Sequence, residues 1–212
     1  MTIFEDDIRQ IKEQGDSNFI EIKHGKNTIA LRNTKMSKEN IQLLTKWRKK
    51  YLDSFGSKFE PSEERTKKWL KEQIIEKPDR ILFLIIYNNK KIGHIGLCNF
   101  NRSSNSGEID NVLRGRKIGP YNIMEIALRS ILRLGFEYFE LSKIWLKVFS
   151  DNYKAINLYE RSGLLTIKSS PVKRFFVKDG WNWREVKLKK NILPERFFSI
   201  MEITKQDFKN ND

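Results

Sequence analysis

Two segments in the second half of the chain carry residue types suited to binding a phosphorylated molecule and to protonating a leaving group. The first is a basic turn that contains glycine and runs into an expected helix at Pro120. It consists of Arg114, Gly115, Arg116, Lys117, Ile118 and Gly119. Such a turn points backbone N–H groups at one place, and the start of the helix adds about half a positive charge. Together they would hold a pyrophosphate.

The second segment carries the candidate proton donor. It contains Asn152, Ala155, Leu158, Tyr159 and Gly163. A phenol has an unperturbed pKa of about 10, so Tyr159 would be protonated at neutral pH and could donate its proton to a leaving group. The residues alone leave another interpretation open, in which Tyr159 is a core residue with a satisfied hydroxyl and Asn152 is a helix cap.

Taken together, the two segments resemble the acyl-CoA site of the GNAT N-acetyltransferases. In that family the turn has the form Arg/Gln-x-x-Gly-x-Gly/Ala, and residues 152–164 match the signature N-x-x-A-x-x-L-Y-x-x-x-G-hydrophobic. Lys117 departs from the pattern, which has glycine at that place. A positive φ disfavours a side chain with a Cβ, so we expect the loop to sit differently and the Lys117 ammonium group to contact phosphate.

The resemblance implies acetyl-CoA as the cofactor and a role for each of several residues. Tyr159 would protonate the thiolate of coenzyme A, and Asn152 would bridge a strand end and the cofactor. Backbone N–H groups around Val112 and Leu113 would hold the thioester carbonyl and the pantetheine arm, while residues 114–119 would bind the pyrophosphate. No Cys/His or Ser/His pair indicates an acyl-enzyme, so we expect an amine to attack acetyl-CoA directly in a ternary complex.

An amine attacks a thioester only as the free base, so a group that removes its proton is needed. Glu108 and Asp110 are the first candidates, because positions two apart on a strand share a face. His94, on the neighbouring expected strand, is a third candidate. Each of the three could instead be an ion-paired or packed strand residue.

The segment that begins with Trp47 and Arg48, continues through a loop and runs from Pro61 to Trp69 resembles the acceptor side of GNAT enzymes that acetylate nucleotide-linked amino sugars. Such an acceptor needs a stacking surface for its base and cations for its diphosphate. The candidate residues are Trp47, Arg48, His94, Arg174 and Trp183, although each alone could serve packing or the surface. The leading prediction is acetylation of a dTDP- or UDP-linked amino-deoxy sugar, for example a dTDP-3-amino-3,6-dideoxyhexose, for surface polysaccharide synthesis such as that of O-antigen.

Two other functions stay open at this stage. One is acetylation of a protein N-terminus or of a small amine. The other is a catalytically inactive, basic module that binds nucleic acid, a partner that we expect less than a nucleotide-linked sugar.

The elements that must position these residues are those of a GNAT fold. We predict the class α/β (α+β), with a mixed, mostly antiparallel central sheet flanked by helices. Hydrophobic periodicity predicts helices that begin at residues 37 and 61 and helices over 120–134 and 153–161. Expected strands cover 27–32, 81–87, 91–101, 108–113, 143–149 and 164–168, followed by a hairpin of 174–177 and 183–188.

Length and composition set the outer limits of this interpretation. A chain of 212 residues suits one domain, which we place at 27–190, between an N-terminal extension (1–26) and a C-terminal tail (191–212). A net charge of +14, from 41 basic and 27 acidic residues, favours multiply anionic substrates, although solvated surface lysines also account for it. The single cysteine, Cys98, rules out an internal disulfide, and the two histidines lack the spacing of a metal site.

No apolar stretch is long enough to span a bilayer, and the first residues lack the apolar region of a secretory signal. We therefore expect a cytoplasmic protein without membrane insertion. A homodimer is compatible with the sequence, which does not decide the question.

Overall fold

The computed structural model describes residues 3–13, 18–187 and 193–210. Its strands are β1 (Asn18–His24), β2 (Asn27–Asn33), β3 (Ser57–Phe59), β4 (Arg80–Tyr87), β5 (Lys90–Asn101), β6 (Ser106–Arg114), β7 (Lys143–Phe149), β8 (Leu165–Val177), β9 (Gly180–Glu185) and β10 (Arg196–Thr204). Its helices are α1 (Ile3–Glu13), α2 (Lys38–Lys50), α3 (Glu63–Leu70), α4 (Ile123–Arg133), α5 (Tyr153–Arg161) and α6 (Lys205–Asn210). Single wider turns, Lys71–Ile75 and Leu134–Tyr138, extend α3 and α4.

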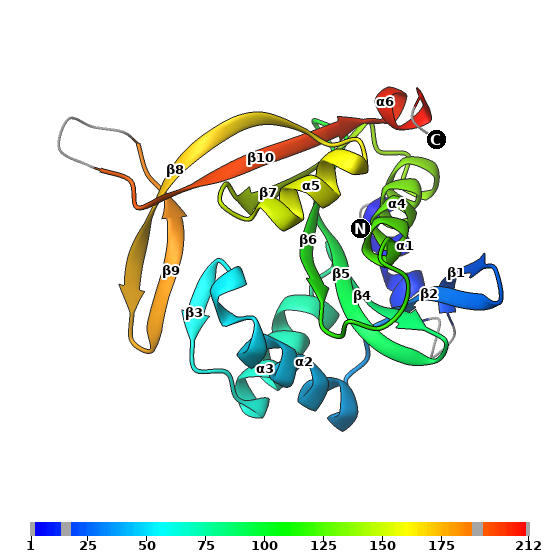
Figure 1. Ribbon diagram of the computed structural model, residues 1–212, viewed down its shortest axis with the longest axis horizontal. Helices are drawn as coiled ribbons and strands as arrows, with labels where there is room; N and C mark the ends of the chain where they lie inside the picture. The colour runs from blue at the N-terminus through cyan, green and yellow to red at the C-terminus, as the bar shows by residue number, and fades with distance from the viewer. Residues whose placement is uncertain (1–2, 14–17, 188–192, 211–212) are drawn as a thin grey trace.

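All ten strands form one sheet, in the order β1-β2-β4-β5-β6-β7-β10-β8-β9-β3 (Figure 1). Neighbouring strands pair antiparallel except β6 and β7, which are parallel. These two pair over a short stretch, Ser106–Glu108 of β6 with Lys143–Trp145 of β7. The helices cover the sheet on both faces. This mixed, mostly antiparallel sheet flanked by helices confirms the predicted fold class.

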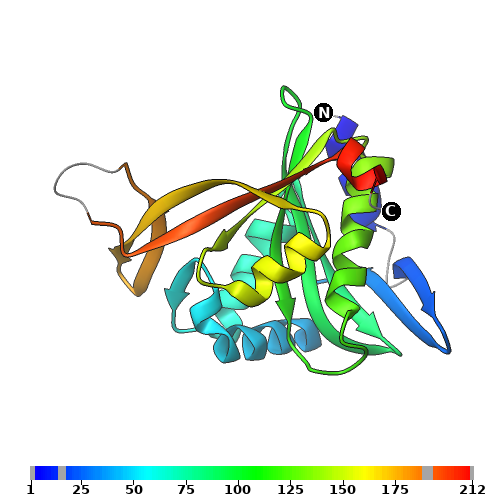
Figure 2. The ribbon, with the colours of Figure 1, turned by 45° about the horizontal axis from the view of Figure 1, so that its top comes forward.

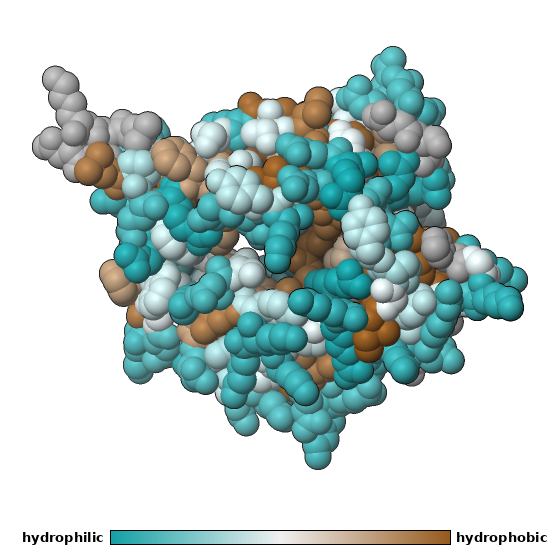
Figure 3. Space-filling view, in the orientation of Figure 1, coloured by the Kyte–Doolittle hydropathy of each residue, from teal (hydrophilic) through white to brown (hydrophobic). Residues whose placement is uncertain are grey.

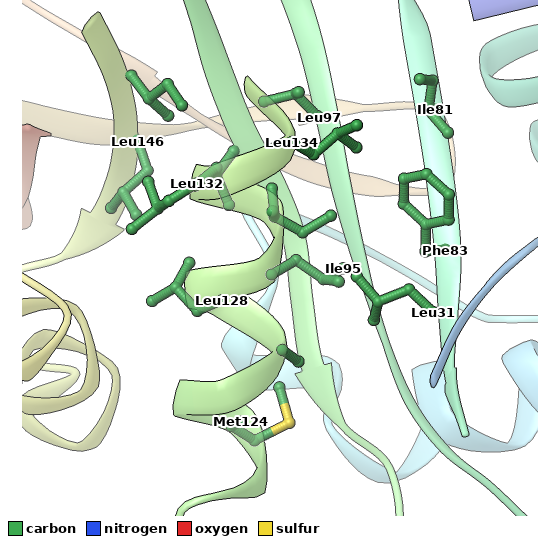
Figure 4. Packing of buried hydrophobic residues seen from close by; sticks show 14 of the residues in the cluster. Leu31, Ile81, Phe83, Ile95, Leu97, Met124, Leu128, Leu132, Leu134 and Leu146 are labelled. Atoms are coloured by element: carbon green, nitrogen blue, oxygen red, sulfur yellow. The ribbon is translucent and has the colours of Figure 1, made fainter. Parts of the chain in front are cut away.

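The centre of the sheet is buried on both faces, and β4 shows why. Its odd-numbered residues Ile81, Phe83 and Ile85 join a cluster with α1 and α4, while Leu82, Leu84 and Ile86 join a second cluster with α2 and α3. Alternate residues of a strand point to opposite faces, so a continuous apolar run fits a strand between two layers of helices. Figure 4 shows the first cluster, in which α4 lies against the strands.

Several element boundaries differ from the sequence prediction. Helix α4 begins at Ile123 rather than at Pro120, because Tyr121 and Asn122 first form a turn in which Ile123 N–H donates to the Pro120 carbonyl at 3.3 Å. The strands expected at 164–168 and 174–177 are one strand, β8. The expected strand 183–188 begins earlier, at Gly180, and ends at Glu185; residue 188 and the predicted domain boundary at 190 lie outside the described residues.

Strands β1, β3 and β10 were not predicted. The residues assigned to a C-terminal tail include β10, which lies between β7 and β8 in the sheet. Its buried side chains alternate, with Ser199, Met201 and Ile203 on the inner face. That period of two is the ordinary signal of a half-buried strand.

Beyond their short parallel pairing, β6 and β7 diverge (Figure 2). From β7 the sheet continues in space through β10, β8 and β9. Its last pairing is between β9 and β3, a short strand that lies between α2 and α3 in the sequence. Ser57 lies opposite Asn182, and Trp183 N–H donates to the Gly56 carbonyl at 2.8 Å. The space-filling view is hollowed near its centre, between α5 above and the α2–β3 segment below (Figure 3).

Among the described residues, no helix is both long and apolar enough to cross a membrane.

Candidate active site

A bulge in β6 shapes the centre of the site. The register against β5 shifts between the pairs Gly96–Asp110 and His94–Leu113, and Asn111 has a positive φ of 51°. Ile109 and Leu113, four positions apart, would share a face in a regular strand but belong to opposite core clusters. A bulge leaves backbone groups unpaired, and beyond Glu108 the edge of β6 that faces β7 has no strand partner. The predicted N–H donors around Val112 and Leu113 lie on this open stretch.

A cavity of about 100 Å³ lies beside the bulge, between β5 and β6 on one side and α2, β3 and α3 on the other. Its inner end is formed by His94 and Asn111. Its walls are aromatic and cationic, with Phe55, Phe59 and Trp69, and with Arg48 and Arg65. No carboxylate side chain is among the residues that line it.

His94 is 4% exposed, and its Nδ1 lies 2.5 Å from the carbonyl oxygen of Asn111. Because a carbonyl only accepts, Nδ1 carries the hydrogen and Nε2 has a free lone pair. Burial lowers the pKa of His94 to about 4, assisted by the nearby charge of Arg48 and opposed by the bond to Asn111. The ring is therefore neutral at pH 7, with an Nε2 that makes no hydrogen bond within the described chain.

Arg48 projects from the end of α2 into the same cavity. Its Nη2 donates to the Ser57 carbonyl (2.6 Å) and to Ser57 Oγ (2.9 Å), and its guanidinium carbon lies 3.8 Å from the Phe55 ring centre. Its Nε is buried and has no hydrogen-bond partner in the described ranges. Burial lowers the pKa of Arg48 to about 10, so the group stays charged at neutral pH.

The two predicted acids lie on one face of β6, but neither is among the residues that line the cavity. Asp110 accepts from Arg80 at 2.9 Å and from the Asn111 amide at 2.7 Å. Glu108 accepts from the Asn99 amide at 2.5 Å. Burial raises the pKa of both carboxyls, with Arg80 opposing this for Asp110 and the Asn99 bond opposing it for Glu108. Their role as base stays a prediction.

The basic turn is held together by its own arginine. Arg114 Nη2 lies 3.3 Å from the Ile118 carbonyl and 3.4 Å from that of Gly119. Gly119 needs to be glycine, since a Cβ there would lie 2.9 Å from Ile123 Cδ1 in a backbone with positive φ. Lys117 is not among the residues with positive φ, which agrees with the expectation that the loop departs from the family's form at this position, while its contact with phosphate stays a prediction. The side chains of Arg116 and Lys117 are exposed and available to a phosphate.

Tyr159 lies on α5, whose first turn is capped by Asn152 Oδ1 accepting from Ala155 N–H at 3.4 Å. Tyr159 is 6% exposed and packs with the α4 cluster. Burial raises the pKa of its hydroxyl, so the phenol is protonated at neutral pH. Within the described chain that hydroxyl makes no hydrogen bond. The cofactor contacts predicted for Asn152 and Tyr159 stay predictions.

Three of the predicted acceptor residues do not line the cavity. Trp47 is 2% exposed and packs flat on Gly115, where a Cβ would lie only 2.1 Å from the ring. Arg174 and Trp183 lie on the arm formed by β8 and β9, with 5.8 Å between guanidinium carbon and ring centre. The structure thus brings Arg48 and His94 together and holds Arg174 and Trp183 on a separate element.

Sequence reasoning indicated the segment that forms most of the cavity wall but not its individual residues. Phe55 and Phe59 lie in the loop after Arg48, and Arg65 and Trp69 lie in the stretch from Pro61 to Trp69, yet none of the four was named as a site residue. The pairing of β3 with β9 positions this loop, and the local residue pattern does not indicate that pairing. The residue type of Asn111 weakly indicated an irregular backbone at this position, since asparagine tolerates positive φ better than most residues.

In the described ranges, no group of three or more His, Cys, Asp or Glu residues could hold a metal ion.

Comparison with known proteins gives one family and many similar folds. The model of the acetyltransferase (GNAT) domain matches residues 31–165. No curated protein sequence matches the chain. The spermidine N-acetyltransferase of Vibrio cholerae, solved with CoA and spermine, is 17% identical with a TM-score of 0.66, covering 86% of this chain and 98% of that one. The N-acetyltransferase PseH of Campylobacter jejuni is 20% identical with a TM-score of 0.55, covering 83% and 97%.

Proposed function

The chain belongs to the GNAT acetyltransferase family and is an acetyl-CoA-dependent N-acetyltransferase, and we propose that its acceptor is the amine of a nucleotide-linked amino-deoxy sugar, dTDP- or UDP-linked. The observation that carries this proposal is the lining of the cavity beside the β6 bulge. Cations and aromatic rings line it, and no carboxylate does. A sugar linked to a diphosphate and a base matches such walls in charge and in stacking surface.

The same lining disfavours a polyamine acceptor, although the similar Vibrio cholerae protein is a spermidine N-acetyltransferase. A polycation would face Arg48 and Arg65, and the residues that line the cavity include no acid to pair with it. The net charge of +14 would also repel a polycation at long range and attract a polyanion. A cytoplasmic reaction that feeds surface polysaccharide synthesis is consistent with a nucleotide-linked acceptor.

The carrier side fits acetyl-CoA. The edge of β6 beyond Glu108 is open, and the turn before α4 exposes Arg116 and Lys117. The buried Nε of Arg114 also lacks a partner in the described chain. When bound, acetyl-CoA supplies the thioester. The open β6 edge would hold the pantetheine arm and the thioester carbonyl through backbone N–H groups, and the turn would hold the pyrophosphate.

Transfer forms a C–N bond and breaks the C–S bond, so one proton must leave the amine and one must reach the sulfur. Tyr159, which stays protonated, donates a proton to the departing thiolate. For the amine proton, the geometry supports the third of the predicted bases. His94 lines the cavity with a free Nε2, whereas Asp110 is paired with Arg80 and Glu108 lies outside the cavity lining.

The proposal is tested by offering the protein acetyl-CoA with a panel of acceptors and reading acetylation by mass. The panel contains dTDP- and UDP-linked amino sugars, spermidine, a peptide with a free N-terminus and a simple alkylamine. We expect the nucleotide-linked sugars to have the highest kcat/KM. Faster acetylation of spermidine or of the peptide would refute the proposed acceptor while leaving the acetyltransferase activity intact.

A further inference from the structure

Arg48 is a cation in a cavity wall without a counterion. Its contacts in the described chain are the carbonyl and hydroxyl oxygens of Ser57 and the faces of Phe55 and Phe59, all of them uncharged. Its Nε is buried and donates to no acceptor among the residues that the structure describes. Charged groups removed from water are normally paired, because desolvation without a partner is unfavourable. The described part of the chain therefore leaves the pairing of Arg48 incomplete.

Neighbouring residues fix the position of the Arg48 guanidinium, and Arg65 adds a second positive charge to the cavity wall. Ser57 takes two hydrogen bonds from Nη2, and the rings of Phe55 and Phe59 lie 3.8 and 4.8 Å from the guanidinium carbon. Arg65, which lines the same cavity, is paired on its outer side with Asp179 at 2.8 Å. A guanidinium fixed in this way loses little freedom when its remaining N–H groups bind a ligand.

We infer that the cavity binds an anionic group of the acceptor, a phosphate or a carboxylate, with Arg48 as its principal ligand and Arg65 as a second cation. The inference rests on the proposed function in one respect, that the acceptor occupies this cavity. A guanidinium fork matches the oxygens of either group, and the pairing supplies the missing counterion.

The bound anion also acts on His94. Arg48 is the charged group that acts on the ring, the Trp47 ring centre lies 5.9 Å from that of His94, and Arg65 from α3 lines the same cavity. The paired positions on β4 and β6 are Leu84 and Leu113, which do not titrate. Arg48 helps to hold the pKa of His94 low, so an anion that offsets its charge raises that pKa. The acceptor's own anion thereby makes His94 Nε2 a better base for the amine proton.

The test follows the imidazole resonances of His94 by NMR, which is simple because the chain has two histidines. The protein is titrated with inorganic phosphate and, separately, with acetate, in saturating coenzyme A so that the pyrophosphate turn is occupied. We expect a saturable shift of the His94 signal and a rise of its pKa with one anion or both. No response of His94 to either anion would overturn the inference.

Two substitutions separate a specific site from the general basic charge. Arg48→Gln should weaken anion binding roughly tenfold to a hundredfold, the loss expected for hydrogen bonds to a charged group. Arg102→Gln removes the same charge from an exposed turn between β5 and β6 and should leave binding within about twofold, as expected for a screened surface charge. Equal weakening in both variants would overturn the inference. Arg48→Lys keeps the positive charge but lacks the paired N–H groups of the guanidinium. It serves as a second variant in case Arg48→Gln fails to fold.

Kinetics distinguish failure of this inference from failure of the proposed acceptor. We expect Arg48→Gln to raise KM for the nucleotide-linked sugar while the Kd of acetyl-CoA stays unchanged. An unchanged KM would overturn the anion site and leave the sugar as acceptor. A response of His94 to acetate but not to phosphate would keep the anion site and contradict a diphosphate-linked acceptor.

Discussion

The buried imidazole of His94 should make the protein less stable in mild acid. Its pKa is lowered from 6.5 to about 4 by burial, so between these values the unfolded chain binds a proton that the folded chain does not. Stability linked to His94 is therefore complete above pH 6.5 and is lost as the pH falls towards 4. The difference of about 2.5 between the two pKa values corresponds to about 3 kcal/mol, at about 1.36 kcal/mol per pKa unit. The ring is only 4% exposed, so solvent screening reduces this little.

The assay is urea unfolding of the protein and of His94→Gln at a series of pH values from 8 to 4. At pH 8 the variant should be less stable, because glutamine replaces a packed ring. As the pH falls, the two free energies of unfolding should approach each other by about 3 kcal/mol, since only the wild type gains a proton at this position on unfolding. His24→Gln serves as the control for the other histidine. Parallel pH profiles for the wild type and His94→Gln would refute the reasoning.

Three other substitutions test the site and its supports. Tyr159→Phe should lower kcat by about a hundredfold or more without changing the Kd of acetyl-CoA by calorimetry, because only the proton donor is lost; an unchanged kcat would remove Tyr159 as the acid. Gly115→Ala should destabilise the protein by about 1–3 kcal/mol in thermal unfolding, since its Cβ would lie 2.1 Å from the Trp47 ring, and equal stability would contradict that packing. Lys12→Met should lower the free energy of unfolding by about 1–3 kcal/mol, because Lys12 Nζ donates to the carbonyls of Ile74, Ile75 and Lys77 at the end of a helical segment. Lys26→Met, at an exposed position, is the matched control. An equal loss of stability in both variants would refute the capping role of Lys12.

The sequence predicted best those parts of the site that depend on neighbours along the chain. The turn at 114–119, the cap Asn152 and the position of Tyr159 on α5 follow from local residue spacing, and the structure has the corresponding elements there. The strand order near the centre was also predictable, because β4 and β5 are consecutive and joined by a tight turn at Asn88 and Asn89, both with positive φ.

The cavity could not be predicted in the same way, because distant segments build it. Phe59 reaches its place because β3 pairs with β9, more than a hundred residues later in the sequence. His94 and Asn111 meet only because β6 bulges, which reverses the faces of the residues that follow. A regular alternation of residues gives no indication of such a shift. Trp47 was expected to stack on a base, yet its fit against Gly115 buries it.

The pairing of β3 with β9 has a consequence for how such a protein can change over evolutionary time. The walls around Arg48 come mostly from residues 44–69, whereas the residues that we propose to bind acetyl-CoA lie within 108–159. On the proposed assignment, mutations in the first stretch and in the β8–β9 hairpin change which amine is accepted while the residues proposed to bind acetyl-CoA stay the same. Homologous proteins could in this way differ in the amine that they acetylate while all of them take the acetyl group from acetyl-CoA.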